Sequence, residues 1–170
     1  VSEIVQRYPN IHFDFHAHND YDLGTANVLE ALKAGASGIH LTVNGMGERA
    51  GNAPLASAIA VINDFLPELK TSVAEKSLYS VSKLVETFSG FRISGNKPVV
   101  GENVFTQTAG IHADGDKKNK LYFSNLMPER FGRQRRYALG KTSGKANIKN
   151  NLLQLGIHLS DQDLKKVTQR

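Results

Sequence analysis

The chain has 170 residues, of which 40% are hydrophobic, and it carries a formal net charge of +5. That length allows one or two small domains with a buried core, and no apolar run is long enough to span a membrane. The absence of cysteine excludes a disulfide scaffold, a thiolate metal site and a thiol nucleophile. Because the sequence begins with Val1 and not Met, we expect it to be a piece of a longer protein.

The first predicted strand leads into a candidate metal site. Residues 11–15 are apolar and aromatic enough for a short buried strand, and His16 and His18 follow directly. Residues two apart on a strand point to the same face, so the two imidazoles are expected to project together. With a carboxylate and water they would suit Zn, Mn or Fe and leave positions open for a substrate. The alternative is a polar strand end with two surface histidines.

The following segment alternates between helical and strand patterns. Apolar residues at helical spacing predict helices over 25–34, 54–66 and 76–89. Between the first two helices, residues 38–44 alternate apolar and polar side chains as a strand does. This alternation favours parallel βα units.

A second chemical motif, Asn-Gly-Met-Gly-Glu-Arg-Ala-Gly-Asn over 44–52, stands where the second strand meets the next helix. Sites in α/β proteins gather at the carboxyl ends of parallel strands. The glycines would let the backbone approach a ligand closely, and the next helix N-terminus favours an anion. Glu48 and Arg49 can pair with each other or with a substrate. A tight structural turn explains the glycines nearly as well.

From residue 91 onward the sequence is irregular and basic. Nine Lys or Arg stand between residues 112 and 145 against three Asp or Glu. Such a stretch can hold phosphates of a nucleotide-like cofactor or of nucleic acid, and a solvated basic face is the default alternative. Two helices end the chain, one over 148–155 and one after a capping-box-like pattern at Ser160. The predicted parts are a βαβα unit over 1–90, a basic irregular middle over 91–147 and a helical end over 148–170.

Four ordered motifs make the chain similar to a known family. These are residues 16–20 (His-Ala-His-Asn-Asp), 44–52, 106–115 and 137–145. They resemble the Claisen-condensing acyl-CoA synthases, namely the 2-isopropylmalate, citramalate and homocitrate synthases, whose catalytic domain is a metal-dependent TIM barrel. The resemblance implies an α/β fold with the last two βα units of a TIM barrel, followed by mainly helical and irregular linker subdomains. The family's third metal ligand, an aspartate on the first barrel strand, has no match here, so we expect this chain alone to be inactive.

The resemblance also implies roles for particular residues. The family's two metal-binding histidines match His16 and His18, and an asparagine near the metal matches Asn52. The loop that lines the active-site mouth supplies a catalytic candidate, Glu48, and candidates for substrate or cofactor binding, Gly45, Gly47 and Arg49. Two further catalytic candidates, His112 and Tyr122, match a histidine and a tyrosine that a linker subdomain inserts into the neighbouring subunit's site. A homodimer is therefore expected.

The implied reaction joins acetyl-CoA to a 2-oxo acid in branched-chain amino-acid biosynthesis, with Zn, Mg or Mn as the divalent metal. Tyr21-Asp22, where many members have Leu-Gly, is closer to the citramalate synthase branch. Homocitrate synthase is the first alternative. More distant ones are an amidohydrolase, whose first-strand motif resembles residues 14–18, and a basic nucleic-acid-binding module around 133–136. Metal-dependent lyases share the metal-binding part of the family's site, but they should lack a counterpart of residues 112–145. We expect a cytoplasmic enzyme that binds neither nucleic acid nor membrane.

Overall fold

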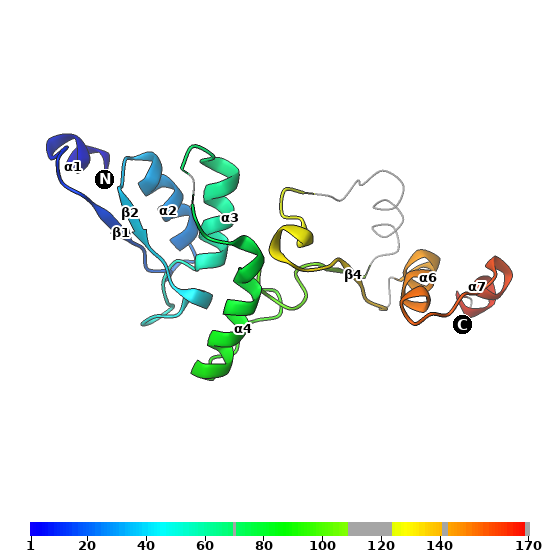
Figure 1. Ribbon diagram of the computed structural model, residues 1–170. Helices are drawn as coiled ribbons and strands as arrows, with labels where there is room; N and C mark the ends of the chain where they lie inside the picture. The colour runs from blue at the N-terminus through cyan, green and yellow to red at the C-terminus, as the bar shows by residue number, and fades with distance from the viewer. Residues whose placement is uncertain (70, 109–123, 141–142, 169–170) are drawn as a thin grey trace. The chain divides into compact units, whose positions relative to one another are not determined.

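The computed structural model describes residues 1–69, 71–108, 124–140 and 143–168 (Figure 1). The chain divides into two compact units, Val1–Val104 and Phe105–Arg170. Within the described residues, no helix has the length and apolarity that crossing a membrane requires. The three-part division expected from composition stays a prediction.

The first unit is built on two parallel strands, β1 (Asp14–His16) and β2 (Gly38–His40), which are joined through helix α2 (Gly24–Lys33). Since side chains alternate along a strand, Phe15 and Ile39 pack against the core while the residues on either side of them face away from it. The predicted α/β class and the parallel pairing are confirmed.

The core of this unit lies between the strands and two helices, α2 and α3 (Leu55–Phe65), which Figure 1 shows next to each other. Small and branched side chains fill it, which lets the helices approach closely. Its buried members are Ala17, Val28, Ala53, Ala58, Ile62 and Leu66. Both helices begin and end within one residue of the ranges that their apolar spacing predicts.

Helix α4 (Leu78–Ser89) follows a 3-10 turn over Glu75–Ser77 and ends at Gly90. Leu78 is buried, but Phe88, on the same predicted apolar face, is 81% exposed. The unit also contains a short helix that the sequence did not predict, α1 (Ser2–Arg7). Part of the apolar face of α4 is thus uncovered among the described residues.

The two predicted strands differ in length from the observed ones. The first was expected over 11–15 but β1 begins at Asp14, and Ile11 is exposed. The second was expected to reach residue 44 but ends at His40, because the amide of Thr42 donates to the carbonyl of Ala53 and the chain then turns. These strand ends were wrong because the pairing that decides them is not local.

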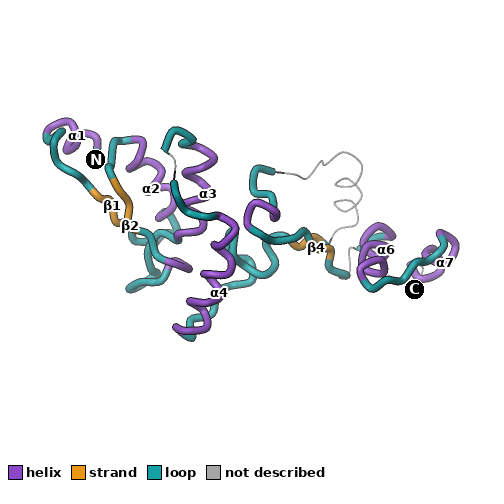
Figure 2. The backbone as a smooth tube through the Cα atoms, in the orientation of Figure 1, coloured by secondary structure: helices purple, strands orange, loops and turns teal. Residues whose placement is uncertain are grey.

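The described residues of the second unit form two short parallel strands and two helices (Figure 2). In chain order these are β3 (Thr106–Gln107), a 3-10 turn over Pro128–Phe131, β4 (Arg136–Tyr137), α6 (Lys145–Gln154) and α7 (Asp161–Thr168). The sequence predicted both helices but neither strand. At the start of α7, the hydroxyl of Ser160 accepts from the amide of Asp163 and donates to its carboxylate, so the capping pattern is used.

Two arginines of the basic segment pack on aromatic rings inside the second unit. The guanidinium of Arg130 lies 5.2 Å from the ring centroid of Phe131, and that of Arg133 lies 5.2 Å from that of Phe105. The two rings stack on each other, and Phe131 is fully buried. Cation–π contacts of this kind give these two charges a packing role within the unit.

Candidate metal-binding site

Two imidazoles lie together at the carboxyl end of β1. The ring centroids of His16 and His18 are 5.2 Å apart and the ring planes are nearly perpendicular. Between them, Ala17 is buried in the core, so both histidines project away from it. The shared face is the one that the strand spacing predicts. Two nitrogen ligands are therefore available on one side of the strand.

Asn52 stands directly across from this pair. Its backbone forms an isolated antiparallel bridge with His18, and its side-chain amide donates to the carbonyl of Met46 over 3.2 Å. The Oδ1 atom of Asn52 is buried and has no hydrogen-bond partner among the described residues. A buried acceptor left unpaired costs about 1–3 kcal/mol, so an unpaired oxygen here favours a ligand that it would coordinate. An amide oxygen from a residue bridged to His18, together with the two imidazoles, is a donor set that fits a divalent metal.

The glycines of the loop pack it against Asn52. A Cβ atom on Gly47 would overlap the side-chain amide of Asn52, and one on Gly51 would overlap the carbonyl oxygen of Gly45. The loop also closes on itself, since the amide of Gly51 donates to the carbonyl of Glu48 over 2.8 Å. Close packing therefore accounts for the glycines, and contact of Gly45 and Gly47 with a substrate stays a prediction. The side chain of Glu48 is exposed.

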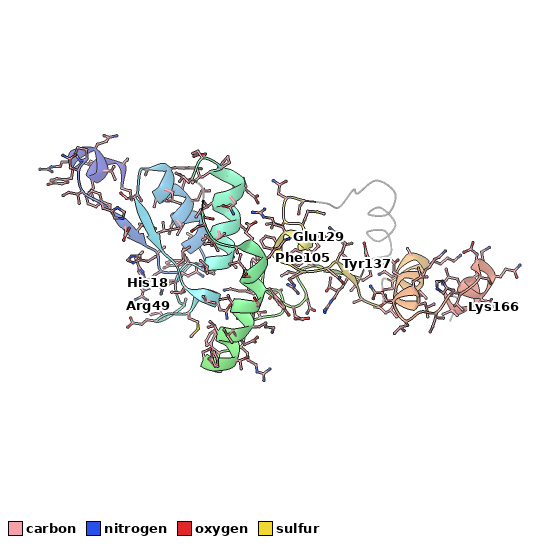
Figure 3. All side chains as sticks on the ribbon, in the orientation of Figure 1. His18, Arg49, Phe105, Glu129, Tyr137 and Lys166 are labelled. Atoms are coloured by element: carbon pink, nitrogen blue, oxygen red, sulfur yellow. The ribbon has the colours of Figure 1, made fainter. Side chains whose placement is uncertain are left out.

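Arg49 connects this loop to the one after His18. Its Nε donates to Oδ1 of Asp20 over 2.8 Å and its Nη2 to Oδ2 over 3.1 Å, a bidentate pair. The hydrogen bond from Arg49 lowers the pKa of Asp20, and the same bond raises the pKa of Arg49. Arg49 has a φ of +54°, a left-handed conformation that is costly for a residue with a side chain. Figure 3 shows its side chain at the same edge of the unit as His18.

The partner of Arg49 is a residue that the sequence did not single out. Glu48 and the substrate were the expected partners, whereas the structure pairs Arg49 with Asp20. A signal was present, because Asp20 belongs to the same motif as His18. The two motifs are thus joined by an ion pair as well as by the backbone bridge to Asn52.

A second group of polar residues lies beside the histidine pair. His12 and His40, for which the sequence indicated no role, both contact Asp14. The hydrogen bond from His12 is the main cause that lowers the pKa of Asp14. The ring centroid of His40 is 5.9 Å from that of His16.

The described residues supply only part of a metal site. Among them, no group of three or more His, Cys, Asp or Glu is placed to hold a metal ion. The donors present are the two imidazoles and the Asn52 oxygen, and a carboxylate would have to come from elsewhere. The catalytic candidates His112 and Tyr122 lie outside the described residues.

Comparison with known proteins gives matches over both units. Residues 1–85 match the HMGL-like family, and residues 99–170 match the family described as homocitrate synthase post-HMGL domain-like. Against the (R)-citramalate synthase of Methanocaldococcus jannaschii, identity is 40% over 161 residues, which are 95% of this chain and 33% of the relative.

Two further relatives carry different names. Identity is 38% over 168 residues with the "Probable 2-isopropylmalate synthase" of Archaeoglobus fulgidus, covering 98% of this chain and 33% of that protein. Identity is 40% over 166 residues with the homocitrate synthase of Sulfolobus acidocaldarius, covering 97% of this chain and 35% of that protein. The chain spans about a third of the length of these curated relatives.

Proposed function

We propose, since this chain belongs to the HMGL-like family, that it is part of an acyltransferase that condenses acetyl-CoA with a 2-oxo acid. The reaction would be of the 2-isopropylmalate or citramalate synthase type, in branched-chain amino-acid biosynthesis. The names of the relatives and the four ordered motifs support this assignment. The single structural observation that carries it is the unpaired, buried Oδ1 atom of Asn52, a residue whose backbone bridges to His18 of the histidine pair.

In this proposal His16, His18 and Asn52 bind a divalent metal, Zn, Mg or Mn. A carboxylate from another part of the full-length protein completes the site, because a catalytic metal usually takes three protein ligands and keeps one position open. When bound, the metal would act as a Lewis acid on the ketone of the 2-oxo acid. Arg49 holds the loop of Asn52 against the loop of His18 through Asp20, and so fixes the distance between the ligands.

In this proposal, residues of the linker subdomain carry out the proton transfer and assist cleavage of the thioester. His112 would take a proton from the methyl group of acetyl-CoA, because imidazole has a suitable intrinsic pKa for proton transfer. Tyr122 would donate a hydrogen bond to the oxyanion that develops or orient the water that cleaves the thioester. Glu48, exposed at the mouth, is a further candidate for acid–base work. Gly45 and Gly47 would bring the backbone close to the substrate.

We further propose that β1–α2 and β2–α3 are the last two βα units of a TIM barrel. Two strands cannot close a barrel, so the site needs the strands of the remaining protein. The linker would reach the neighbouring active site in a homodimer, and the enzyme would be cytoplasmic. On this reading the 170 residues alone have no activity.

Homocitrate synthesis is the second candidate. It is favoured by the 40% identity to the homocitrate synthase of Sulfolobus acidocaldarius and by the family that matches residues 99–170. The two candidates differ in the 2-oxo acid, and therefore in the size and charge of the group next to the ketone.

The test uses the full-length protein that contains this chain. It is incubated with acetyl-CoA and, separately, pyruvate, 2-oxoisovalerate or 2-oxoglutarate, and free CoA is measured with a thiol reagent. We expect release with one of the first two acids, and loss of both release and bound metal in a His16→Ala variant. His158→Ala, an exposed histidine of the second unit, is the matched control. CoA release by His16→Ala at the parent rate and with full metal content would exclude the proposal.

A further inference from the structure

The carboxylate of Asp14 is shared between two histidines on the strand face that the core leaves uncovered. The Nε2 atom of His12 lies 2.8 Å from Oδ1, and the Nε2 atom of His40 lies 3.2 Å from Oδ2. A carboxylate only accepts hydrogen bonds, so both imidazoles present an Nε2–H to Asp14. The residue paired with Asp14 on β2 is Gly38, where a Cβ would overlap the carboxylate. The sequence thus provides the space that this arrangement needs.

The register of the two strands then places His40 against a metal-ligand candidate. His16 and His40 are directly paired across β1 and β2, and their ring centroids are 5.9 Å apart in an edge-to-face arrangement. The ring of His18 is 5.2 Å from that of His16. Within the described part of the chain, the ring of His16 makes no side-chain hydrogen bond. Its neighbouring rings in the described structure are thus the imidazoles of His18 and His40.

A purely stabilising role explains this group poorly. The side chains of His12, Asp14 and His40 are 68%, 40% and 61% exposed. Exposed ion pairs contribute little to stability, because water screens the charges and the side chains lose conformational freedom. The bond between Asp14 and His40 does have one clear geometric effect, which is to fix the ring of His40 beside His16.

We propose that Asp14 is a positioning residue, which holds His40 against His16 and thereby orients His16 toward the metal. The inference rests on the proposed function, in which His16 is a metal ligand. Histidines that bind metals are generally held by an outer partner that fixes the ring, and loss of that partner typically costs 10- to 100-fold in metal affinity. Here the support reaches His16 through a second imidazole.

The test is a titration of the metal-free, full-length protein with Co²⁺ alone, followed through its visible absorption bands. Asp14→Asn keeps the size of the side chain but removes its charge and one acceptor atom. We expect it to weaken Co²⁺ binding roughly 10- to 100-fold and to shift the absorption bands, since the ligand geometry changes. His40→Ala tests the same support from the other strand and should have an effect of similar size. His12→Gln is the matched control, because the bond between Asp14 and His40 remains, and it should stay within a factor of about two.

The double variant distinguishes positioning from separate effects. If Asp14 acts through His40, Asp14→Asn combined with His40→Ala should bind Co²⁺ as weakly as His40→Ala alone, because the shared contact is already lost. If the double variant instead lost Co²⁺ affinity by the product of the two single losses, the two residues would act separately and the inference would be overturned. So would an Asp14→Asn variant with unchanged Co²⁺ affinity and spectrum, alongside a His16→Ala variant that no longer binds Co²⁺. A His16→Ala variant that binds Co²⁺ as the parent does would instead exclude the metal site itself and the inference with it.

Discussion

A buried contact between Asn44 and Ser82 holds the start of the glycine-rich loop to helix α4. The two side chains are 7% and 1% exposed. The amide of Asn44 donates to the carbonyl of Ser82 over 3.0 Å, and the hydroxyl of Ser82 donates to Oδ1 of Asn44. Asn44 adopts a left-handed φ of +61°, which turns the chain into the loop. The conformation of the loop therefore depends on a residue 38 positions away.

Ser82→Ala removes one of these two bonds and leaves Oδ1 of Asn44 buried without a donor. The cost of an unpaired buried acceptor is about 1–3 kcal/mol. Since every 1.4 kcal/mol is a factor of ten in an equilibrium constant, the loop should open roughly 5- to 150-fold more often. The carbonyl of residue 82 still accepts from Asn44, so the fold itself should persist.

Hydrogen exchange of the amides over 43–52, measured by mass spectrometry on the full-length protein, reports this opening directly. Ser80→Ala is the matched control, since Ser80 lies on the same helix as Ser82 and its hydroxyl makes an exposed bond to the carbonyl of Ser77, in the preceding turn. Changes at exposed sites are usually within about 0.5 kcal/mol, so exchange should rise by no more than a factor of about two. Equal exchange in the two variants would show that the buried pair does not hold the loop.

Three further outcomes are expected. Ile62→Ala, at a position 2% exposed in α3, should lower the melting temperature of the full-length protein, because a core cavity of this kind costs about 2–5 kcal/mol. The pKa of Asp163 lies below its usual value because the Ser160 hydroxyl donates to its carboxylate. This hydrogen bond therefore stabilises α7 above the pKa that Asp163 has in the unfolded chain, and the stabilisation is lost as the pH falls through the lower pKa of the folded state. In a carboxyl NMR titration, Ser160→Ala should raise that pKa. Mixed subunits carrying His112→Ala and His16→Ala should recover CoA release through hybrid dimers; exchange of subunits without recovery would place both residues in one subunit's site.

Local patterns were enough to predict the main helices of the first unit. The helices α2, α3 and α4 begin within two residues of the expected positions, because the spacing of apolar side chains is a property of each segment alone. The strand ends were not predictable in the same way. Whether a strand continues depends on its partner, and beyond His40 the chain pairs with residues 53 and 54 instead.

In the candidate site, too, contacts between residues close in sequence were predictable and contacts between distant residues were not. His16 and His18 are two apart on one strand, so their proximity follows from strand geometry. The bond from Arg49 to Asp20 joins residues 29 positions apart, and that from His40 to Asp14 joins residues 26 apart. Both depend on how β1 and β2 are aligned, which the sequence alone does not state.

The alignment also separates the two faces of the strand pair by chemistry. Phe15 and Ile39 cover the helices, while Asp14, His16 and His40 occupy the opposite face. Parallel strands are generally covered on both faces, so a second face built for another packed layer would carry apolar side chains. Here it carries the carboxylate of Asp14, which accepts hydrogen bonds from imidazoles, and the histidine that follows His16 along the chain, His18, bridges to Asn52 through its backbone. Under the proposed function, this face would line a polar interior that holds the metal and a small acidic substrate.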